Sequence, residues 1–179
     1  MVIVSIILGL GLTLVLRGLS KLMRSEHPPA VVVLYGVFLL MTHLQTWWGL
    51  WDAREIGQWT QIRFVLIAAY PCILYAMSEL MLPMASRPET DWKAHFLSVR
   101  RWYFSLQATL VVAGVMLTWL MLSVPLLHPY RLVQLGLFLL SLLALATERL
   151  RLHFWIAVSL IAVLTIGQLL FRMLPGLSG

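Results

Sequence analysis

Long apolar runs are the feature that most constrains what this chain can fold into. A helix needs about 20 mostly apolar residues to cross the hydrocarbon core of a bilayer. Six segments approach that length, at about 2–23, 30–51, 61–82, 102–127, 132–147 and 154–171. Short connections between them carry most of the charged residues. The pattern predicts an all-α, polytopic transmembrane helical bundle of six spans, with residues 1–179 forming a single transmembrane domain.

The composition excludes an ordinary soluble domain. Hydrophobic residues make up 61% of the chain and charged residues only 11%, whereas a soluble globular chain carries about 25% charged residues. So few charges cannot cover a surface that faces water, and lipid is the expected surrounding. The net charge of +6 does not indicate nucleic-acid binding, because the basic residues lie in the connections, where they interact with anionic headgroups. A lone Cys72 excludes a disulfide framework.

The distribution of basic residues predicts the orientation. The first, third and fifth connections, with their flanks, hold nine of the 13 Lys and Arg residues, and the opposite side holds four. Because basic connections stay in the cytoplasm, both termini are predicted to lie outside it. No basic residue precedes the first apolar run and no small-x-small cleavage site follows it, so we expect a span there rather than a cleaved signal peptide.

The longest connection, 84–101, predicts a short interfacial helix before the fourth span. Its apolar residues recur at helical spacing and form one stripe: Trp92, Phe96, Val99 and Tyr103. Thr90 or Asp91 is expected to cap the start of this helix. Basic residues occupy the other faces, which is typical of a helix lying in the cytoplasmic interface. The alternative is a helix that docks a partner protein.

The ten residues from His43 to Asp52 concentrate the side chains that can bind a ligand or line a pore: His43, Gln45, Trp47, Trp48, Trp51 and Asp52. Steps of four place His43, Trp47 and Trp51 on one helical face. An aromatic pocket with one titratable group suits a cationic or planar ligand. Tryptophan also prefers the membrane interface, so an aromatic belt, with His43 bonded to a neighbouring helix, is the alternative.

Glu79 is the remaining candidate site residue, because it is the one carboxylate well within an apolar run. It continues a strip of small residues at four-residue spacing: Ala68, Cys72 and Ala76. Such a strip lets another helix approach closely. Glu79 is therefore a proton or cation site, or it pairs structurally with Arg17 or Gln107.

Other polar residues of the spans collect at two depths rather than along a continuous pathway. The predicted outer leaflet holds Thr42, Gln45 and Gln134, and the inner leaflet holds Gln107 and Glu148. Polar groups in a membrane are costly, so they are the expected place for function.

Catalytic, cofactor and metal sites are not predicted. Glycine-rich phosphate loops, His-x-x-x-His and Cys-x-x-Cys are absent from the sequence. Asp91, His95 and His153 share the predicted cytoplasmic side, where they can hold a metal or act in acid–base catalysis, but such spacing is common by chance. We therefore expect no cofactor, and the sequence leans against an enzyme without excluding one.

Three short motifs resemble a family of small, uncharacterised bacterial inner-membrane proteins: Ile6-Ile-Leu-Gly-Leu-Gly-Leu-Thr13, His43-x-x-x-Trp-Trp48 and Arg100-Arg-Trp-Tyr-Phe104. The resemblance implies a bacterial inner-membrane location, with periplasmic termini. It carries over no catalytic or binding residue.

Together these features favour a subunit of an oligomeric channel or of a small-solute or ion transporter. Six short helices enclose only a narrow path, so a homo-oligomer is the easier route to a pore. The alternative is a non-catalytic membrane partner that docks another protein through segment 61–82 or 91–101. A membrane-embedded enzyme or redox carrier ranks third.

Overall fold

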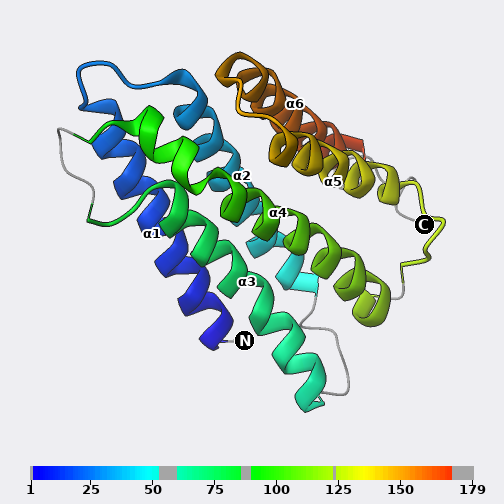
Figure 1. Ribbon diagram of the computed structural model, residues 1–179. Coiled ribbons are helices and arrows are strands. Elements are labelled where there is room, and N and C mark those ends of the chain that lie inside the picture. The colour runs from blue at the N-terminus through cyan, green and yellow to red at the C-terminus, as the bar shows by residue number, and fades with distance from the viewer. Residues whose placement is uncertain (1, 53–59, 86–89, 123, 171–179) are drawn as a thin grey trace.

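Each predicted apolar segment forms one α-helix in the computed structural model (Figure 1). The structure describes residues 2–52, 60–85, 90–122 and 124–170. The helices are α1 (Val2–Met23), α2 (Ala30–Asp52), α3 (Gln61–Met81), α4 (Trp92–Leu122), α5 (Tyr130–Ala146) and α6 (Leu150–Gln168). No strand occurs in the described ranges. The all-α fold is therefore confirmed.

Helix length and composition indicate an integral membrane protein. α1, α2, α3, α4 and α6 are each long and apolar enough to cross a membrane. α5 is apolar but has only 17 residues, which is the lower end of the length that spans a bilayer, about 17–25 residues.

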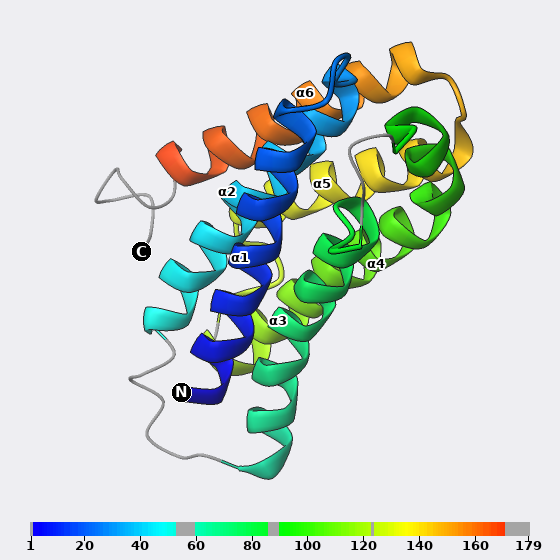
Figure 2. The same ribbon diagram turned by 90° about the vertical axis from the view of Figure 1, so that its left-hand side faces the viewer.

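The bundle is arranged around α2 and α4. α2 packs against α1, α3, α4 and α6, and α4 packs against α2, α3 and α5. Figure 1 shows α1 and α3 on one side of the bundle and α5 and α6 on the other. From the side in Figure 2, α1 lies between α2 and α3. Side chains on α2 and α4 therefore meet residues from both halves of the bundle.

Side-chain caps mark where two of the helices begin. Asp91 accepts hydrogen bonds from the backbone N–H groups of Lys93 and Ala94 at 3.0 and 3.1 Å, which starts α4 as expected. Thr60 accepts from the backbone N–H of Arg63 at 3.3 Å and starts α3. Both residues satisfy N–H groups that have no partner within their helix.

The segment before the fourth span corrects one expectation. The predicted interfacial helix and the predicted span at 102–127 form a single helix, because α4 runs from Trp92 to Leu122 without a break. At 1.5 Å per residue its 31 residues extend about 46 Å, which exceeds a hydrocarbon core of about 30 Å.

The apolar stripe of that segment lies inside the protein rather than in the lipid interface. Trp92, Phe96 and Tyr103 are buried. The Phe96 ring stacks on the Tyr35 ring of α2, with centroids 5.5 Å apart. The spacing that predicted one helical face was right, but Phe96 and Tyr103 of that face pack against Tyr35 of α2, and Val99 is half-buried.

Glycines allow the closest helix contacts. A Cβ at Gly18 of α1 would lie 2.5 Å from the Cβ of Leu82, directly after α3. A Cβ at Gly9 of the same helix would have no atom within 4 Å. Gly18 therefore sets how closely the C-terminal part of α1 packs on the end of α3.

We expect Gly18→Ala to destabilise the protein by about 1–3 kcal/mol, because the added methyl overpacks a contact that cannot widen without moving backbone. The thermal midpoint of the detergent-purified protein measures the effect. Gly9→Ala adds the same methyl where space is open and should leave the midpoint unchanged or raised. Equal midpoints for the two variants would contradict the close packing at Gly18.

Candidate functional site

A partly open cavity of about 100 Å³ lies between α2, α3, α4 and α5. We call it the α2–α5 cavity. Its polar side chains come from all four helices: Thr42, Gln45, Thr46, Tyr70, Thr118, Tyr130 and Gln134. Water occupies about 30 Å³ per molecule in the liquid, so the space suits about three waters or one solute of similar volume.

The α2–α5 cavity offers hydroxyl and amide groups, and none of its described lining residues carries a charged side chain. Hydroxyls and amides both donate and accept hydrogen bonds. Gln45 donates from Nε2 to the Tyr130 hydroxyl at 3.2 Å, which ties α2 to α5 across the cavity. The Tyr70 side chain interacts with Thr46. The lining therefore matches an uncharged ligand with hydrogen-bonding groups.

Gly114 of α4 keeps the cavity open. A Cβ there would lie 3.4 Å from Cε2 of Tyr70 and 3.8 Å from Nε2 of Gln134. These are ordinary contact distances, so a methyl fits, and any longer side chain would extend into the cavity.

Arg131 places a positive charge directly behind the lining. Its Nη1 donates to Oγ1 of Thr118 at 2.6 Å and to Oε1 of Gln134 at 2.7 Å. Its other hydrogen-bond partners are backbone carbonyls, including that of Val124 at 2.8 Å. Among the described residues no carboxylate pairs with Arg131. The charge makes this end of the cavity unfavourable for a cation.

His43 faces α1 rather than the α2–α5 cavity. Its Nδ1 donates to the carbonyl of Leu39 at 2.9 Å, so Nε2 is the unprotonated nitrogen of the neutral ring. Nε2 is buried without a hydrogen-bond partner, and a Cβ at Gly11 would lie 2.5 Å from it. The ring thus fills the space that Gly11 leaves and makes the contact between α1 and α2.

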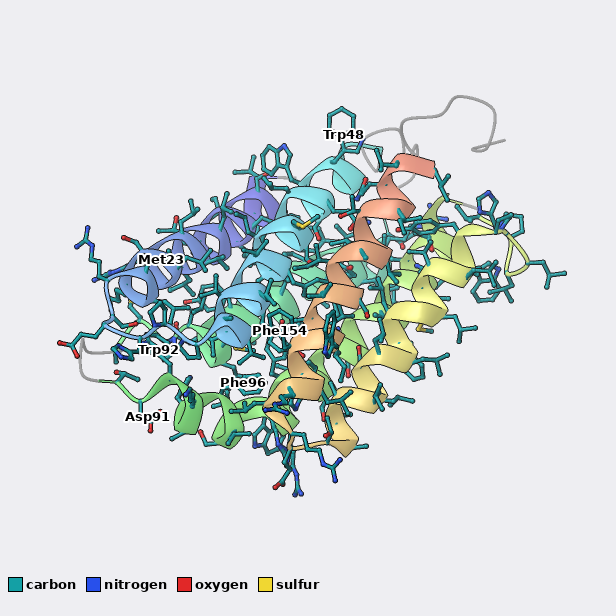
Figure 3. The ribbon with its side chains drawn as sticks, turned by 90° about the horizontal axis from the view of Figure 1, so that it is seen from above. Met23, Trp48, Asp91, Trp92, Phe96 and Phe154 are labelled. Atoms are coloured by element: carbon teal, nitrogen blue, oxygen red, sulfur yellow. The ribbon has the colours of Figure 1, made fainter. Side chains whose placement is uncertain are left out.

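The tryptophans next to His43 point outward where the structure describes them. Trp47 and Trp48 are 49% and 61% exposed. Figure 3 shows Trp48 near the end of α2 with its ring pointing away from the bundle. The side chains of Trp51 and Asp52 lie outside the described part of the structure. Of the six candidates from His43 to Asp52, the structure places Gln45 at the cavity.

Glu79 caps the end of its own helix. Its Oε1 accepts a hydrogen bond from the backbone N–H of Met84 at 3.1 Å. Gln107, which was one of its expected partners, instead donates from Nε2 to Oγ of Ser141 at 3.0 Å. The bond to Met84 closes the turn that follows α3.

Asp91, His95 and His153 serve three separate structural roles. Asp91 caps α4, and the His95 Nε2 donates to the carbonyl of Leu80 at 2.9 Å. His153 donates from Nε2 to the carbonyl of Thr147 at 3.0 Å. Each histidine therefore holds a backbone carbonyl at the end of a neighbouring segment.

An aromatic cluster closes the bundle at the end opposite the cavity. It surrounds the buried His153 with Tyr35, Phe96, Tyr103 and Phe104. The His153 ring stacks on Phe104 with centroids 5.4 Å apart, and Phe96 meets it edge-on at 4.9 Å. Because its Nε2 donates to Thr147, Nδ1 can accept from the Tyr35 hydroxyl, 3.2 Å away. The cluster is closely packed and its histidine is fully bonded.

Arg100 and Glu148 form an ion pair beside the aromatic cluster. The Arg100 side chain is 5% exposed and that of Glu148 is 74% exposed. The hydrogen bond from Arg100, together with its positive charge, holds the pKa of the Glu148 carboxyl below its usual value. The pair links α4 to the α5–α6 connection.

Several cavity residues were not among the site residues predicted from the sequence. Thr42 and Gln134 were recognised only as polar residues of the outer leaflet. Tyr70 was recognised only as a polar residue near the centre of the membrane. Thr118 and Tyr130 gave no separate signal, because hydroxyl residues are tolerated in many transmembrane helices. Gly114 became recognisable only once its neighbours were placed.

No family model, curated protein or solved structure matches this chain.

We expect the thermal midpoint to depend on pH through Glu148. A lowered pKa means that the ion pair stabilises the fold fully above the unfolded value, about 4.3. This contribution is lost as the pH falls through the lower folded value. Glu148→Gln should remove that part of the acid dependence and lower the midpoint at pH 7, because Arg100 is left buried without its counter-ion. The expected change in the thermal midpoint is small, since solvent screens the exposed carboxylate.

The double variant Arg100→Met, Glu148→Gln is the control and should recover midpoint relative to Glu148→Gln alone. Identical acid slopes for the wild type and Glu148→Gln would show that the pair does not contribute.

Proposed function

We propose that this integral membrane protein is a facilitator that lets a small, uncharged, hydrogen-bonding solute cross the membrane. The observation that carries the proposal is the α2–α5 cavity, which opens between four helices and is lined by hydroxyls and amides. Such groups are costly within a bilayer unless they are needed. They replace the hydration shell of a polar solute, as the lining of a selective pore does.

Size and charge narrow the class of solute. A space of about 100 Å³ admits molecules of the size of urea or glycerol. Arg131, hydrogen-bonded to two lining residues, opposes the entry of cations. The proposal therefore favours the transport of neutral solutes over that of cations.

Location and assembly form part of the proposal. By the positive-inside asymmetry, the α2–α5 cavity belongs to the outer leaflet and both termini lie outside the cytoplasm. A bacterial inner membrane with anionic headgroups on the cytoplasmic side is the setting that the motif resemblance implies. Assembly into a homo-oligomer would shield the exposed lipid-facing helices around the path. Docking of another membrane protein is the alternative role, and segment 91–101 contributes little to it because its apolar stripe is buried.

Gly114→Leu tests the function by filling the α2–α5 cavity. Purified protein in liposomes should accelerate the uptake of urea or glycerol over empty liposomes, measured by stopped-flow light scattering. We expect Gly114→Leu to abolish most of this acceleration, because the new side chain would enter the space beside Tyr70 and Gln134.

Gly9→Leu is the matched control, since it makes the same change on α1 where no atom lies within 4 Å of the new Cβ. It should retain wild-type uptake. Wild-type liposomes that take up both solutes no faster than empty ones would refute the proposed function.

A further inference from the structure

We propose that the solute crosses along the interface of α4 and α5, by a polar seam that continues from the α2–α5 cavity to the Arg100–Glu148 ion pair. This inference rests on the proposed function and adds the route to it. The seam consists of four facing pairs, each with one residue from α4 and one from α5 or the turn after it: Thr118 with Arg131, Gly114 with Gln134, Gln107 with Ser141, and Arg100 with Glu148.

The pairs follow a regular antiparallel register. Arg100, Gln107 and Gly114 are seven residues apart along α4, and Gln134, Ser141 and Glu148 are seven apart along the other segment. Residues seven apart on a helix lie on one face, which applies to the three residues of α4 and to Gln134 and Ser141 of α5. Glu148 lies after the end of α5 and joins the line through its ion pair with Arg100. Figure 1 shows α4 and α5 running side by side. The polar pairs therefore form one line between the two helices.

The length of this line matches the membrane. From Arg100 to Thr118, α4 rises about 27 Å at 1.5 Å per residue. The hydrocarbon core of a bilayer is about 30 Å thick. The seam thus places polar groups from one side of the core to the other, which a contact made only to hold two helices together does not require.

The inner half of the seam has polar atoms without protein partners. Oε1 of Gln107, the hydroxyl of Tyr103, and Nε and Nη1 of Arg100 are buried with no hydrogen-bond partner. Gln107 and Tyr103 are 1% and 0% exposed. They occupy the same face of α4 at steps of three and four. Buried polar groups are normally satisfied, by water where the protein supplies no partner. Of these, the atoms of Gln107 and Arg100, which lie outside the aromatic cluster, therefore mark binding positions for water or for the solute.

Leu110 separates the two halves. It is buried on the seam face of α4, three residues after Gln107 and four before Gly114. Along α4, the residues that line the α2–α5 cavity begin at Gly114, after Leu110. The residues with unpartnered atoms, Tyr103 and Gln107, come before Leu110. Leu110 is therefore the apolar barrier that the solute must pass.

Two substitutions on the seam act in opposite directions. Gln107→Leu removes the central hydrogen-bonding group and should slow urea and glycerol uptake about tenfold, the change that the loss of one such group produces. Leu110→Ala lowers the barrier and should accelerate uptake severalfold. A gain of this kind cannot result from misfolding. Thr109→Val removes a polar group from the exposed side of the same helix and should leave uptake unchanged.

Thiol accessibility tests the seam independently of transport. In a Cys72→Ser background, Gln107→Cys should react with the small uncharged reagent methyl methanethiosulfonate, and so should be protected from later maleimide labelling in denaturant. This reagent reacts with the thiolate, which forms only where water reaches the thiol. Thr109→Cys, which faces outward on α4, is the matched control and should remain available to the maleimide.

The outcomes separate the route from the function. Uptake that is blocked by Gly114→Leu but unaffected by Gln107→Leu and Leu110→Ala would overturn the route and leave the proposed function intact. The same conclusion follows if the thiol introduced at position 107 is as unreactive as the one at position 109, because the pair with Ser141 is then a dry structural contact. If liposomes that contain the wild-type protein took up urea and glycerol no faster than empty liposomes, both the route and the proposed function would be overturned.

Discussion

A polar side chain between membrane-spanning helices costs free energy unless another group in the protein satisfies it, and this cost arranges most of the polar residues here. His95 and His153 each hold a backbone carbonyl, and Asp91 holds two backbone N–H groups. Glu79 closes the turn after its helix. These residues stabilise the ends of helices, so their polar groups are accounted for without invoking a ligand. Apart from Nε2 of His43, which packs against Gly11 of α1, the buried side-chain atoms without a partner in the described residues lie along α4.

The two ends of the bundle differ in a way that suits controlled passage. Around His153 of α6, aromatic rings from α2 and α4 fill the interior, and the buried Arg100 is paired with an exposed carboxylate. At the other end, four helices leave space between hydroxyl and amide side chains. Leu110 lies between these regions on the helix that contacts both. One closely packed half and one half with an open cavity are the arrangement expected of a facilitator that opens only transiently.

The sequence predicted the six helices because hydrophobic length is a property of each segment alone, and the cap at Asp91 is likewise local. It did not predict which neighbour each helical face would meet. The spacing of Trp92, Phe96 and Tyr103 identified one face, yet an amphipathic stripe looks the same whether lipid or another helix covers it. His43 shows the same limit, because only the contact with Gly11 reveals that its ring faces α1. The seven-residue spacing of Gln134, Ser141 and Glu148 was visible in the sequence, but it gained meaning only when the matching spacing on α4 was placed opposite.

The proposed passage requires water to reach the α2–α5 cavity. Hydroxyl-radical footprinting of the protein in lipid nanodiscs measures directly which side chains contact water. Radicals form in water and modify the aromatic side chains that contact it. Tyr70 lines the α2–α5 cavity and Tyr35 is sealed in the aromatic cluster. If water fills the cavity, Tyr70 should be modified rapidly and Tyr35 should not be modified. If Tyr70 were as unreactive as Tyr35, the space between α2, α3, α4 and α5 would be dry, and the proposed passage would have no entrance.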